Sequence, residues 1–123
     1  MTLEHYRRWF DNGTTGSPTC EDKTRVYDFV DTTIEHVYPR NALGSVVNAA
    51  LEPLKNTLGN LTFMGPTDNV AGGNDDFLTK HPLFENSSVG LNQDIGQNTQ
   101  WTDAEIGQNA NRLKDLACSI FTL

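Results

Sequence analysis

Apolar residues recur at helical spacing in four segments of the chain, and the clearest of these lies near the C-terminus. There Thr102 and Glu105 have the spacing of a capping box, in which two side chains satisfy the free N–H groups at the start of a helix. The apolar series that follows occupies one helical face and comprises Ile106, Ala110, Leu113, Leu116, Ala117, Ile120 and Phe121. The pattern predicts a helix from about Asp103 to Phe121 that packs against a core.

The same spacing predicts helices at Pro18 to Tyr38 and at Asn41 to Leu58, and a shorter one at about Leu3 to Asp11. Pro53 interrupts the second of these patterns, because proline has no N–H and clashes with the preceding turn. Either that helix kinks, or it ends near Leu51 and a short helix begins with Pro53. The residues expected in the core are Phe29, Val30, Ile34, Val37, Leu43, Val47, Leu51, Leu54, Leu58, Ile106, Leu113, Leu116 and Ile120.

The stretch from Gly59 to Trp101 shows no sustained helix or strand period. Its apolar residues form short clusters around Phe63, Phe77 and Phe84, each bounded by Gly, Pro or Asn turn signals. Connections longer than about 12–15 residues without secondary structure are uncommon in compact domains, and they are usually functional or disordered. We therefore expect a long ordered loop in which the three phenylalanines are anchors.

The predicted fold class is mainly α. We expect a single helical domain over residues 1–123, built as a small irregular bundle of three to four helices with one long ordered loop at about residues 59–101. Within the loop, a short strand at Leu61 to Met64 and a helical turn near Asp75 to Leu78 are both compatible with the local pattern.

Charge and composition limit the kinds of partner that the chain is expected to have. The chain has nine basic against sixteen acidic residues, a net charge of -7, and basic residues that are spread along its length. Binding to a nucleic-acid backbone needs a concentrated positive surface, so we expect no nucleic-acid partner. No apolar run approaches the roughly 18 residues of a membrane-spanning helix, so we expect no membrane partner.

The first residues and the cysteines favour some compartments over others but do not identify one. The first ten residues lack the apolar core of a signal peptide, which favours a cytoplasmic or virion-like location over secretion. Cys20 and Cys118 either close a disulfide or are free thiols, and a reducing compartment favours the free thiols.

Asp28, Asp31 and Glu35 recur at helical spacing opposite the apolar face of the helix predicted at Pro18 to Tyr38, which predicts a solvated acidic stripe.

One segment concentrates oxygen-bearing side chains around a Gly-Gly pair. Its members are Asp68, Asn69, Asn74, Asp75 and Asp76. Calcium takes six to eight oxygen ligands from a chain that can wrap around it, so these residues are the candidate metal ligands and calcium is the candidate cofactor. The alternative is a turn region in which Asn74 or Asp75 caps a short helical turn.

Catalytic spacing is not evident in the chain. His5, His36 and His81 match no metal-binding or catalytic histidine motif, and no nucleophile motif is present, so no catalytic residue is assigned. The leading hypothesis is a non-enzymatic interaction or assembly protein, a structural component of a larger complex or virus-like particle, with a protein partner or self-association that orders the loop. The alternative is a small-ligand or calcium-type binding domain that uses the 59–101 loop. An enzyme of unidentified reaction is the third hypothesis.

Overall fold

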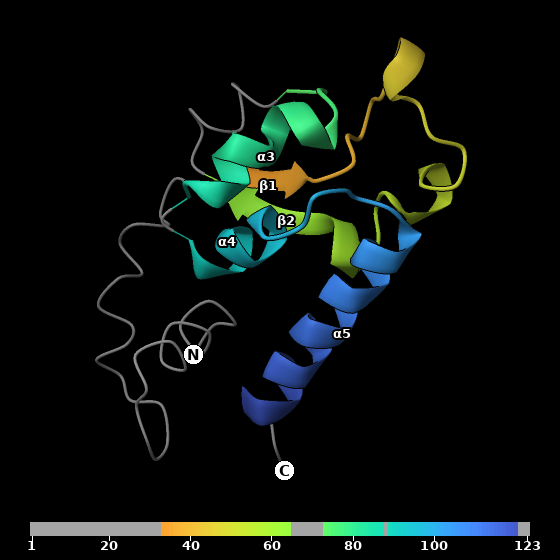
Figure 1. Cartoon of the computed structure of the whole chain (residues 1–123). Helices are drawn as coiled ribbons and strands as arrows, with labels where there is room; N and C mark the ends of the chain where they lie inside the picture. The colour runs from red at the N-terminus through yellow and green to blue at the C-terminus, as the bar shows by residue number, and fades with distance from the viewer. Residues whose placement is uncertain (1–32, 65–72, 88, 121–123) are drawn as a thin grey trace.

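The computed structural model describes residues 33–64, 73–87 and 89–120 (Figure 1). The elements in chain order are strand β1 (Thr33–His36), the 3-10 turns η2 (Gly44–Val46), η3 (Glu52–Leu54) and η4 (Leu58–Asn60), strand β2 (Leu61–Met64), and helices α3 (Phe77–Glu85), α4 (Gly90–Gly96) and α5 (Asp103–Ile120). About half of the described residues are helical, which agrees with the predicted mainly α class at that coarse level. A small sheet is present in addition, and a single bundle of three to four helices is not confirmed.

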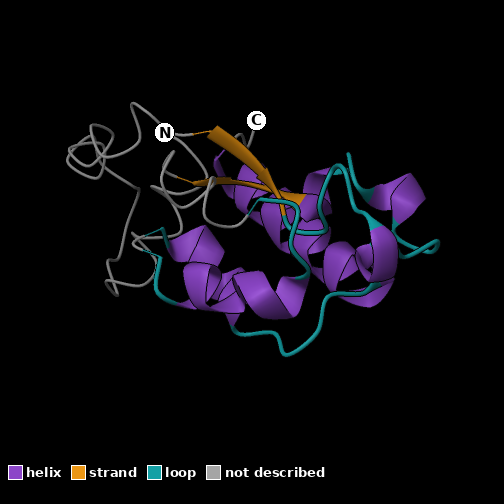
Figure 2. Cartoon of the chain, turned by 90° about the horizontal axis from the view of Figure 1, so that it is seen from above, coloured by secondary structure: helices purple, strands orange, loops and turns teal. Residues whose placement is uncertain are grey.

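Strands β1 and β2 form an antiparallel pair, and residues 37–60 connect them. The register places Thr33 opposite Met64 and His36 opposite Leu61. The strands lie side by side with α3 and α4 close to them (Figures 1 and 2). The short strand predicted at Leu61 to Met64 is therefore confirmed, and its partner strand ends at a histidine.

The predicted helix at Pro18 to Tyr38 is wrong over residues 33–36, and its earlier part lies outside the described residues. A strand has a side-chain period of 2 instead of 3.6, so the two patterns bury different residues. Ile34, expected inside, is 68% exposed, whereas Glu35, expected in a solvated stripe, is buried. The acidic side chain is tolerated inside because Lys80 of α3 pairs with it, and a local pattern cannot show that contact.

The predicted helix at Asn41 to Leu58 is also wrong, because the chain forms three separate 3-10 turns there. Gly44 has a φ of +58°, a left-handed conformation that interrupts a helix and that glycine adopts without strain. Pro53 is the second residue of η3, one position from the helix start that the alternative with a short helix placed at this proline. Leu51 is buried as expected.

The prediction of one long ordered loop at about residues 59–101 is wrong, because this segment contains β2, α3 and α4. Asp76 begins α3, because its carboxylate accepts the N–H of Thr79 at 2.9 Å. Helix α3 contains Pro82 and buries Lys80, so its sequence lacks an amphipathic period. Helix α4 is buried on nearly all sides, and a helix without a solvated face shows no period either.

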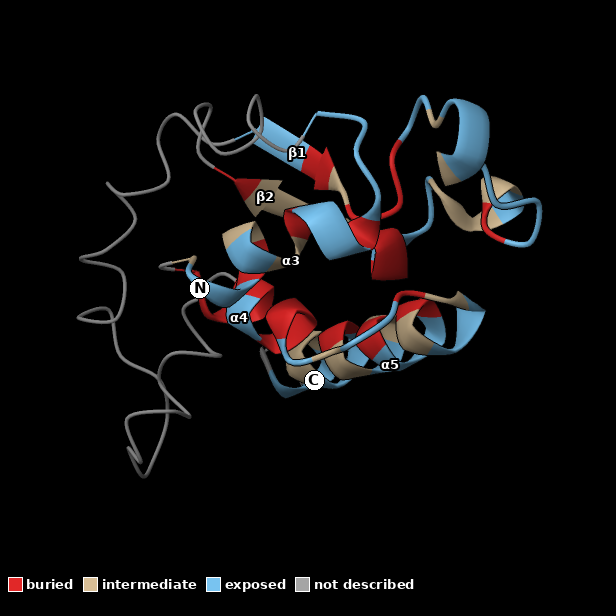
Figure 3. Ribbon diagram, turned by 45° about the horizontal axis from the view of Figure 1, so that its top comes forward, coloured by how far each residue is buried: buried red, intermediate tan, exposed pale blue. Residues whose placement is uncertain are grey.

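The predicted C-terminal helix is confirmed as α5. At its start the backbone N–H of Thr102 donates to the carboxylate of Glu105 at 2.8 Å, and the hydroxyl of Thr102 accepts the N–H of Ala104. The buried side of α5 faces the rest of the domain (Figure 3). Cys118 on this helix is an exposed free thiol, and Cys20 lies outside the described residues. No described helix has the length and apolar character needed to cross a bilayer.

The larger buried cluster lies where the residues after β1, the end of β2, α3, α4 and the start of α5 meet. Its buried members are Val37, Tyr38, Leu51, Met64, Phe77, Phe84, Ile95, Trp101 and Ile106. A smaller cluster contains Val89, Leu91 and Leu113, with Phe63 and Leu116 packed against it. Phe77 and Phe84 are thus confirmed as anchors, and Phe63 is partly buried.

The predicted core is confirmed only in part. The structure buries Val37, Leu51, Ile106 and Leu113, and it partly buries Leu54 and Leu116. Four residues expected inside are exposed instead, namely Ile34, Leu43, Val47 and Leu58. Phe29, Val30 and the side chain of Ile120 lie outside the described residues. The exposed residues come from the segments where a helix was expected and a strand or 3-10 turns are present.

Candidate functional site

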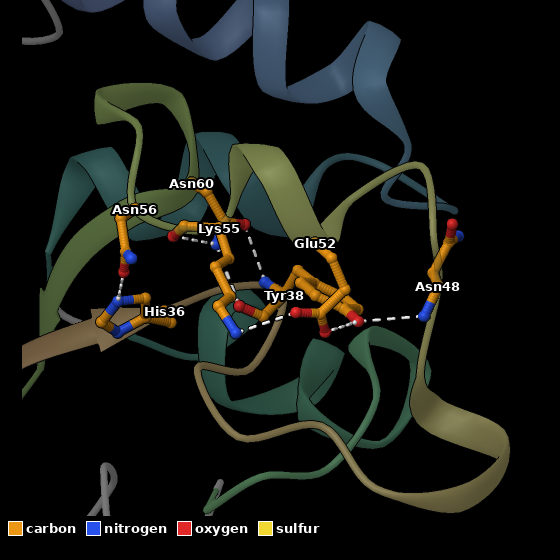
Figure 4. Close-up of polar contacts among 7 residues, drawn as sticks. All are labelled: His36, Tyr38, Asn48, Glu52, Lys55, Asn56 and Asn60. Carbon is orange, nitrogen blue, oxygen red and sulfur yellow. Dashed lines mark hydrogen bonds and ion pairs between the residues drawn. The ribbon is translucent and has the colours of Figure 1, made fainter.

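His36 lies at the end of β1, and three contacts hold it. Its ring Nε2 is 3.0 Å from the carboxamide Oδ1 of Asn56 (Figure 4). Its backbone carbonyl accepts a hydrogen bond from Lys80 Nζ at 2.7 Å, and the next N–H, that of Val37, donates to the carbonyl of Asn60 at 3.0 Å. The ring and the peptide unit that follows it are therefore both held in place.

The contact with Asn56 fits one tautomer of the neutral imidazole. A carboxamide oxygen only accepts hydrogen bonds, so Nε2 of His36 carries the proton in this arrangement. The lone pair then resides on Nδ1. A histidine held in this form can accept a proton from water, which is the role of a general base.

A polar cavity of about 160 Å³ adjoins this histidine. Its lining consists of Ile34, Glu35, His36, Arg40, Asn41, Gly73 and Asn74. Arg40 and Asn41 are exposed, so they are accessible from solvent. The cavity thus combines an imidazole, a guanidinium, two carboxamides and the carboxylate of Glu35, which Lys80 neutralises. The first three kinds of group can bind and activate an anionic ester.

Glu35 and Lys80 form a buried ion pair behind the histidine. Lys80 Nζ lies 2.7 Å from Glu35 Oε1, and both side chains are almost completely excluded from solvent. Burial raises the pKa of Glu35, and the hydrogen bond and charge of Lys80 oppose that rise without cancelling it. The pair connects α3 to the last two residues of β1.

Asn60, at the far end of the 37–60 connection, is completely buried, and its carboxamide makes four hydrogen bonds. Its carboxamide oxygen accepts the N–H of Tyr38 at 2.8 Å and the indole N–H of Trp101 at 2.9 Å. Its amide nitrogen donates to the carbonyls of Tyr38 at 2.9 Å and of Lys55 at 2.8 Å (Figure 4). Asn60 therefore closes the connection next to His36.

A second network braces the middle of the connection (Figure 4). The hydroxyl of Tyr38 donates to Glu52 at 2.7 Å and accepts the N–H of Asn48 at 2.9 Å. Lys55 donates to the other carboxylate oxygen of Glu52 at 2.8 Å. The bond from Lys55, followed by that from Tyr38, lowers the pKa of Glu52, and burial raises the pKa of Tyr38.

A larger cavity of about 270 Å³ is lined in part by Tyr38. Its lining consists of Tyr38, Val46, Asn48, Leu51, Asp76, Phe77, Leu78, Thr99, Gln100, Trp101 and Thr102. These described lining residues include one carboxylate and no lysine, arginine or histidine. The smaller cavity therefore suits a phosphate-containing substrate better than the larger one.

Three of the five predicted metal ligands lie in the part of the chain that the structure describes. Asp68 and Asn69 lie outside the described residues, and Asn74 lines the cavity beside His36. Asp75 is exposed, whereas Asp76 caps α3 and lines the larger cavity. Within residues 33–64, 73–87 and 89–120, no group of three or more His, Cys, Asp or Glu side chains is placed to hold a metal ion. The calcium site stays a prediction, and the cap of the helical turn is Asp76 instead of Asn74 or Asp75.

The sequence interpretation missed His36, Arg40 and Asn41 as site residues. Their partners come from distant segments, and only the fold brings Asn74 to the same cavity. A local signal does exist, since Glu35 and His36 follow the β-branched run Thr32 to Ile34, and Pro39 is followed by a cation and a carboxamide. It places a polar cluster directly after a strand.

A family model described as "GmrSD restriction endonucleases, C-terminal domain" matches residues 3–116 of the chain. No curated protein matches the chain. A restriction endonuclease acts on DNA, so the match contradicts the hypothesis of a non-enzymatic structural or assembly protein. It also contradicts the expectation that nucleic acid is not a partner. That expectation failed because net charge averages over the whole chain, whereas a cleavage site needs only local cations.

Proposed function

The chain belongs to the family of GmrSD restriction endonuclease C-terminal domains, and we propose that it hydrolyses DNA phosphodiester bonds at the cavity beside His36. The supporting observation is the imidazole of His36, whose Nε2 proton is committed to Asn56 and whose ring adjoins a cavity that contains Arg40. This combination supplies a base and a phosphate-binding cation on one short segment.

His36 acts as the general base in this proposal. Nδ1 takes a proton from a water molecule while the water oxygen forms a bond to phosphorus. The bond between phosphorus and one sugar oxygen breaks, and that oxygen takes up a proton from solvent. The contact with Asn56 keeps Nε2 protonated throughout, so Nδ1 remains the basic atom.

Arg40 binds the phosphate in the same step. Its guanidinium can donate two parallel hydrogen bonds to non-bridging phosphate oxygens. Charge on those oxygens increases as the water attacks, so a fixed cation stabilises the transition state more than the ground state. Asn41 and Asn74 add neutral amide donors at the cavity.

We propose that the oxygen-rich segment predicted from the sequence supplies ligands to a divalent cation. Asn74 lines the His36 cavity, and its carboxamide oxygen is the kind of donor that a calcium or magnesium ion takes. A bound divalent cation supplies Lewis-acid polarisation of the phosphate. Cleavage is expected to stop in excess EDTA and to return when magnesium or calcium is added back.

The acidic charge of the chain affects how strongly it is expected to bind DNA in an assay. Affinity for DNA comes largely from lysine and arginine contacts to phosphates and falls steeply with salt. With a net charge of -7, the domain is expected to bind DNA weakly by itself. Because the family is described as a C-terminal domain, we propose that other parts of such an enzyme supply most of the affinity.

The proposal is tested by nicking of supercoiled plasmid DNA at low salt in the presence of magnesium. His36→Ala is expected to lower the cleavage rate at least about 100-fold, the usual contribution of a general base. Arg40→Ala is expected to lower it by about 100-fold, with partial recovery in Arg40→Lys. His81→Gln, which changes a histidine of α3 outside the lining of this cavity, is the matched control and should cleave like the parent chain.

The result that would refute the proposal is full cleavage by His36→Ala protein that has the circular dichroism spectrum and urea midpoint of the parent chain. Equal losses in His36→Ala and His81→Gln would also count against it, because such losses would indicate damage to the fold.

A further inference from the structure

Lys80 is an unusual residue for the interior of a domain. It lies on α3, and only 1% of its surface is exposed. Lysine is almost never fully buried unless its charge is paired. Its ammonium group donates to Glu35 Oε1 at 2.7 Å and to the backbone carbonyl of His36 at 2.7 Å. One buried cation therefore contacts both of the last two residues of β1.

Stability alone is a weak explanation for this arrangement. Taking two charges out of water costs several kcal/mol per ion, and replacing a buried pair by apolar residues is often neutral or stabilising. The pair at Lys80 and Glu35 has a second feature, the bond to the carbonyl of His36. That bond gives the ammonium group a role that an apolar side chain could not fill.

The bond holds a specific peptide unit. The carbonyl of the unit between His36 and Val37 accepts from Lys80, and its N–H donates to the carbonyl of Asn60. The plane of this peptide is thus held from both sides. That plane is joined directly to the Cα of His36, which carries the ring that contacts Asn56. The ring position depends on the backbone as well as on its own hydrogen bond.

We propose that Lys80 is a positioning residue for the general base His36, and that Glu35 holds the ammonium group of Lys80 in place for this purpose. Lys80 keeps the backbone of His36 in the orientation that commits Nε2 to Asn56 and leaves Nδ1 for the reaction. The inference rests on the proposed DNA hydrolysis. A displacement of about 1 Å in a catalytic group can cost about 100-fold in rate, so this role predicts a loss in kcat.

The variants separate positioning from folding. Lys80→Met removes the ammonium group but leaves the Glu35 carboxylate buried without its partner, so this protein is expected to unfold more easily. Lys80→Met combined with Glu35→Gln removes both charges, and its urea midpoint is expected to return close to that of the parent chain. In this double variant the carbonyl of His36 still lacks its ammonium donor. Lys55→Met is the matched control, because it removes a lysine from a partly exposed pair with Glu52.

Plasmid cleavage gives the first readout. The double variant is expected to lose about 100-fold in kcat with KM changed less than about threefold, while Lys55→Met keeps the parent values. If kcat returned together with the urea midpoint in the double variant, Lys80 would have only a structural role and the inference would be overturned.

The second readout does not depend on cleavage. Nitrogen-15 NMR of histidine-labelled full chain reports which ring nitrogen of His36 carries the proton. The parent chain and Lys55→Met are expected to show the Nε2-protonated form, and the double variant a mixture of both forms. An unchanged tautomer in the double variant would overturn the inference. A changed tautomer in a chain that cleaves no DNA would instead leave the positioning role intact and refute the proposed function.

Discussion

Replacement of Asn60 by alanine is expected to be among the most destabilising single changes in the described part of the chain. The carboxamide of Asn60 is completely buried and satisfies two donors and two acceptors at once. The groups it serves belong to Tyr38, Lys55 and Trp101, which come from the start and the end of the 37–60 connection and from the residue before the α5 cap. Alanine can make none of these bonds.

The magnitude follows from the bonds that are lost. A typical intramolecular hydrogen bond contributes about 1 kcal/mol net, and a buried group left without a partner costs about 1–3 kcal/mol. Four bonds, two of them to N–H donors that remain inside the domain, therefore correspond to about 4 kcal/mol. Domains of this size are stable by about 5–15 kcal/mol, so Asn60→Ala is expected to remove a large share of the total.

Urea unfolding followed by circular dichroism is the assay. With an m-value of about 2 kcal/mol/M, the midpoint of Asn60→Ala is expected about 2 M below that of the parent chain. Asn86→Ala is the matched control, since Asn86 is exposed and its amide donates only to the carbonyl of Pro82. Its expected change is below about 0.5 kcal/mol.

Trp101→Phe provides a graded test of the same network. It removes the single indole donor and keeps an aromatic ring against Phe77, whose ring centroid is 5.5 Å away. Its expected cost is about 1–2 kcal/mol. A change of less than about 1 kcal/mol in Asn60→Ala, or equal changes in Asn60→Ala and Asn86→Ala, would refute the argument that this carboxamide closes the connection.

Further predictions concern the packing and the start of α5. Gly59→Ala would place a Cβ 2.0 Å from the carbonyl oxygen of Ile106 and is expected to cost about 1–3 kcal/mol or more, whereas Gly107→Ala meets no atom within 4 Å and is expected to stabilise the helix by about 0.5–1 kcal/mol. Midpoints that shift in the same direction in these two variants would contradict the packing argument. Thr102→Ala is expected to cost about 1 kcal/mol at pH 7 through loss of the helix cap. Hydrogen bonds from Thr102 lower the pKa of Glu105 below its ordinary 4.5, so their contribution to stability is present above pH 4.5 and disappears as the pH falls through the folded-state value. Urea unfolding from pH 7 down to pH 3 should therefore show the difference between Thr102→Ala and the parent chain shrinking, and a constant difference would exclude this linkage.

The site could be predicted only in fragments. The oxygen-rich segment was identified from composition, and Asn74 from it does line the His36 cavity. His36 itself was treated as an ordinary histidine, because its contacts with Asn56 and Lys80 cross 20 and 44 positions of sequence. Glu35 was expected in a solvated stripe for the same reason. The spacing of residues along the sequence does not reveal partners that are so far apart in the chain.

The sequence by itself determined only local structure, namely the elements whose start, end and buried face depend on residues a few positions apart. The capping pair Thr102 and Glu105 and the apolar period behind it were sufficient for α5, because a helix start and an amphipathic face depend on neighbours three and four positions apart. The strand at Leu61 to Met64 and the anchors Phe77 and Phe84 were found in the same way. Tertiary structure alone decided the rest. The segment ending at His36 became a strand because it could pair with β2 and because Lys80 neutralised Glu35 inside the domain. Both are long-range contacts whose free energy outweighs local propensity, and they are also what places the candidate base.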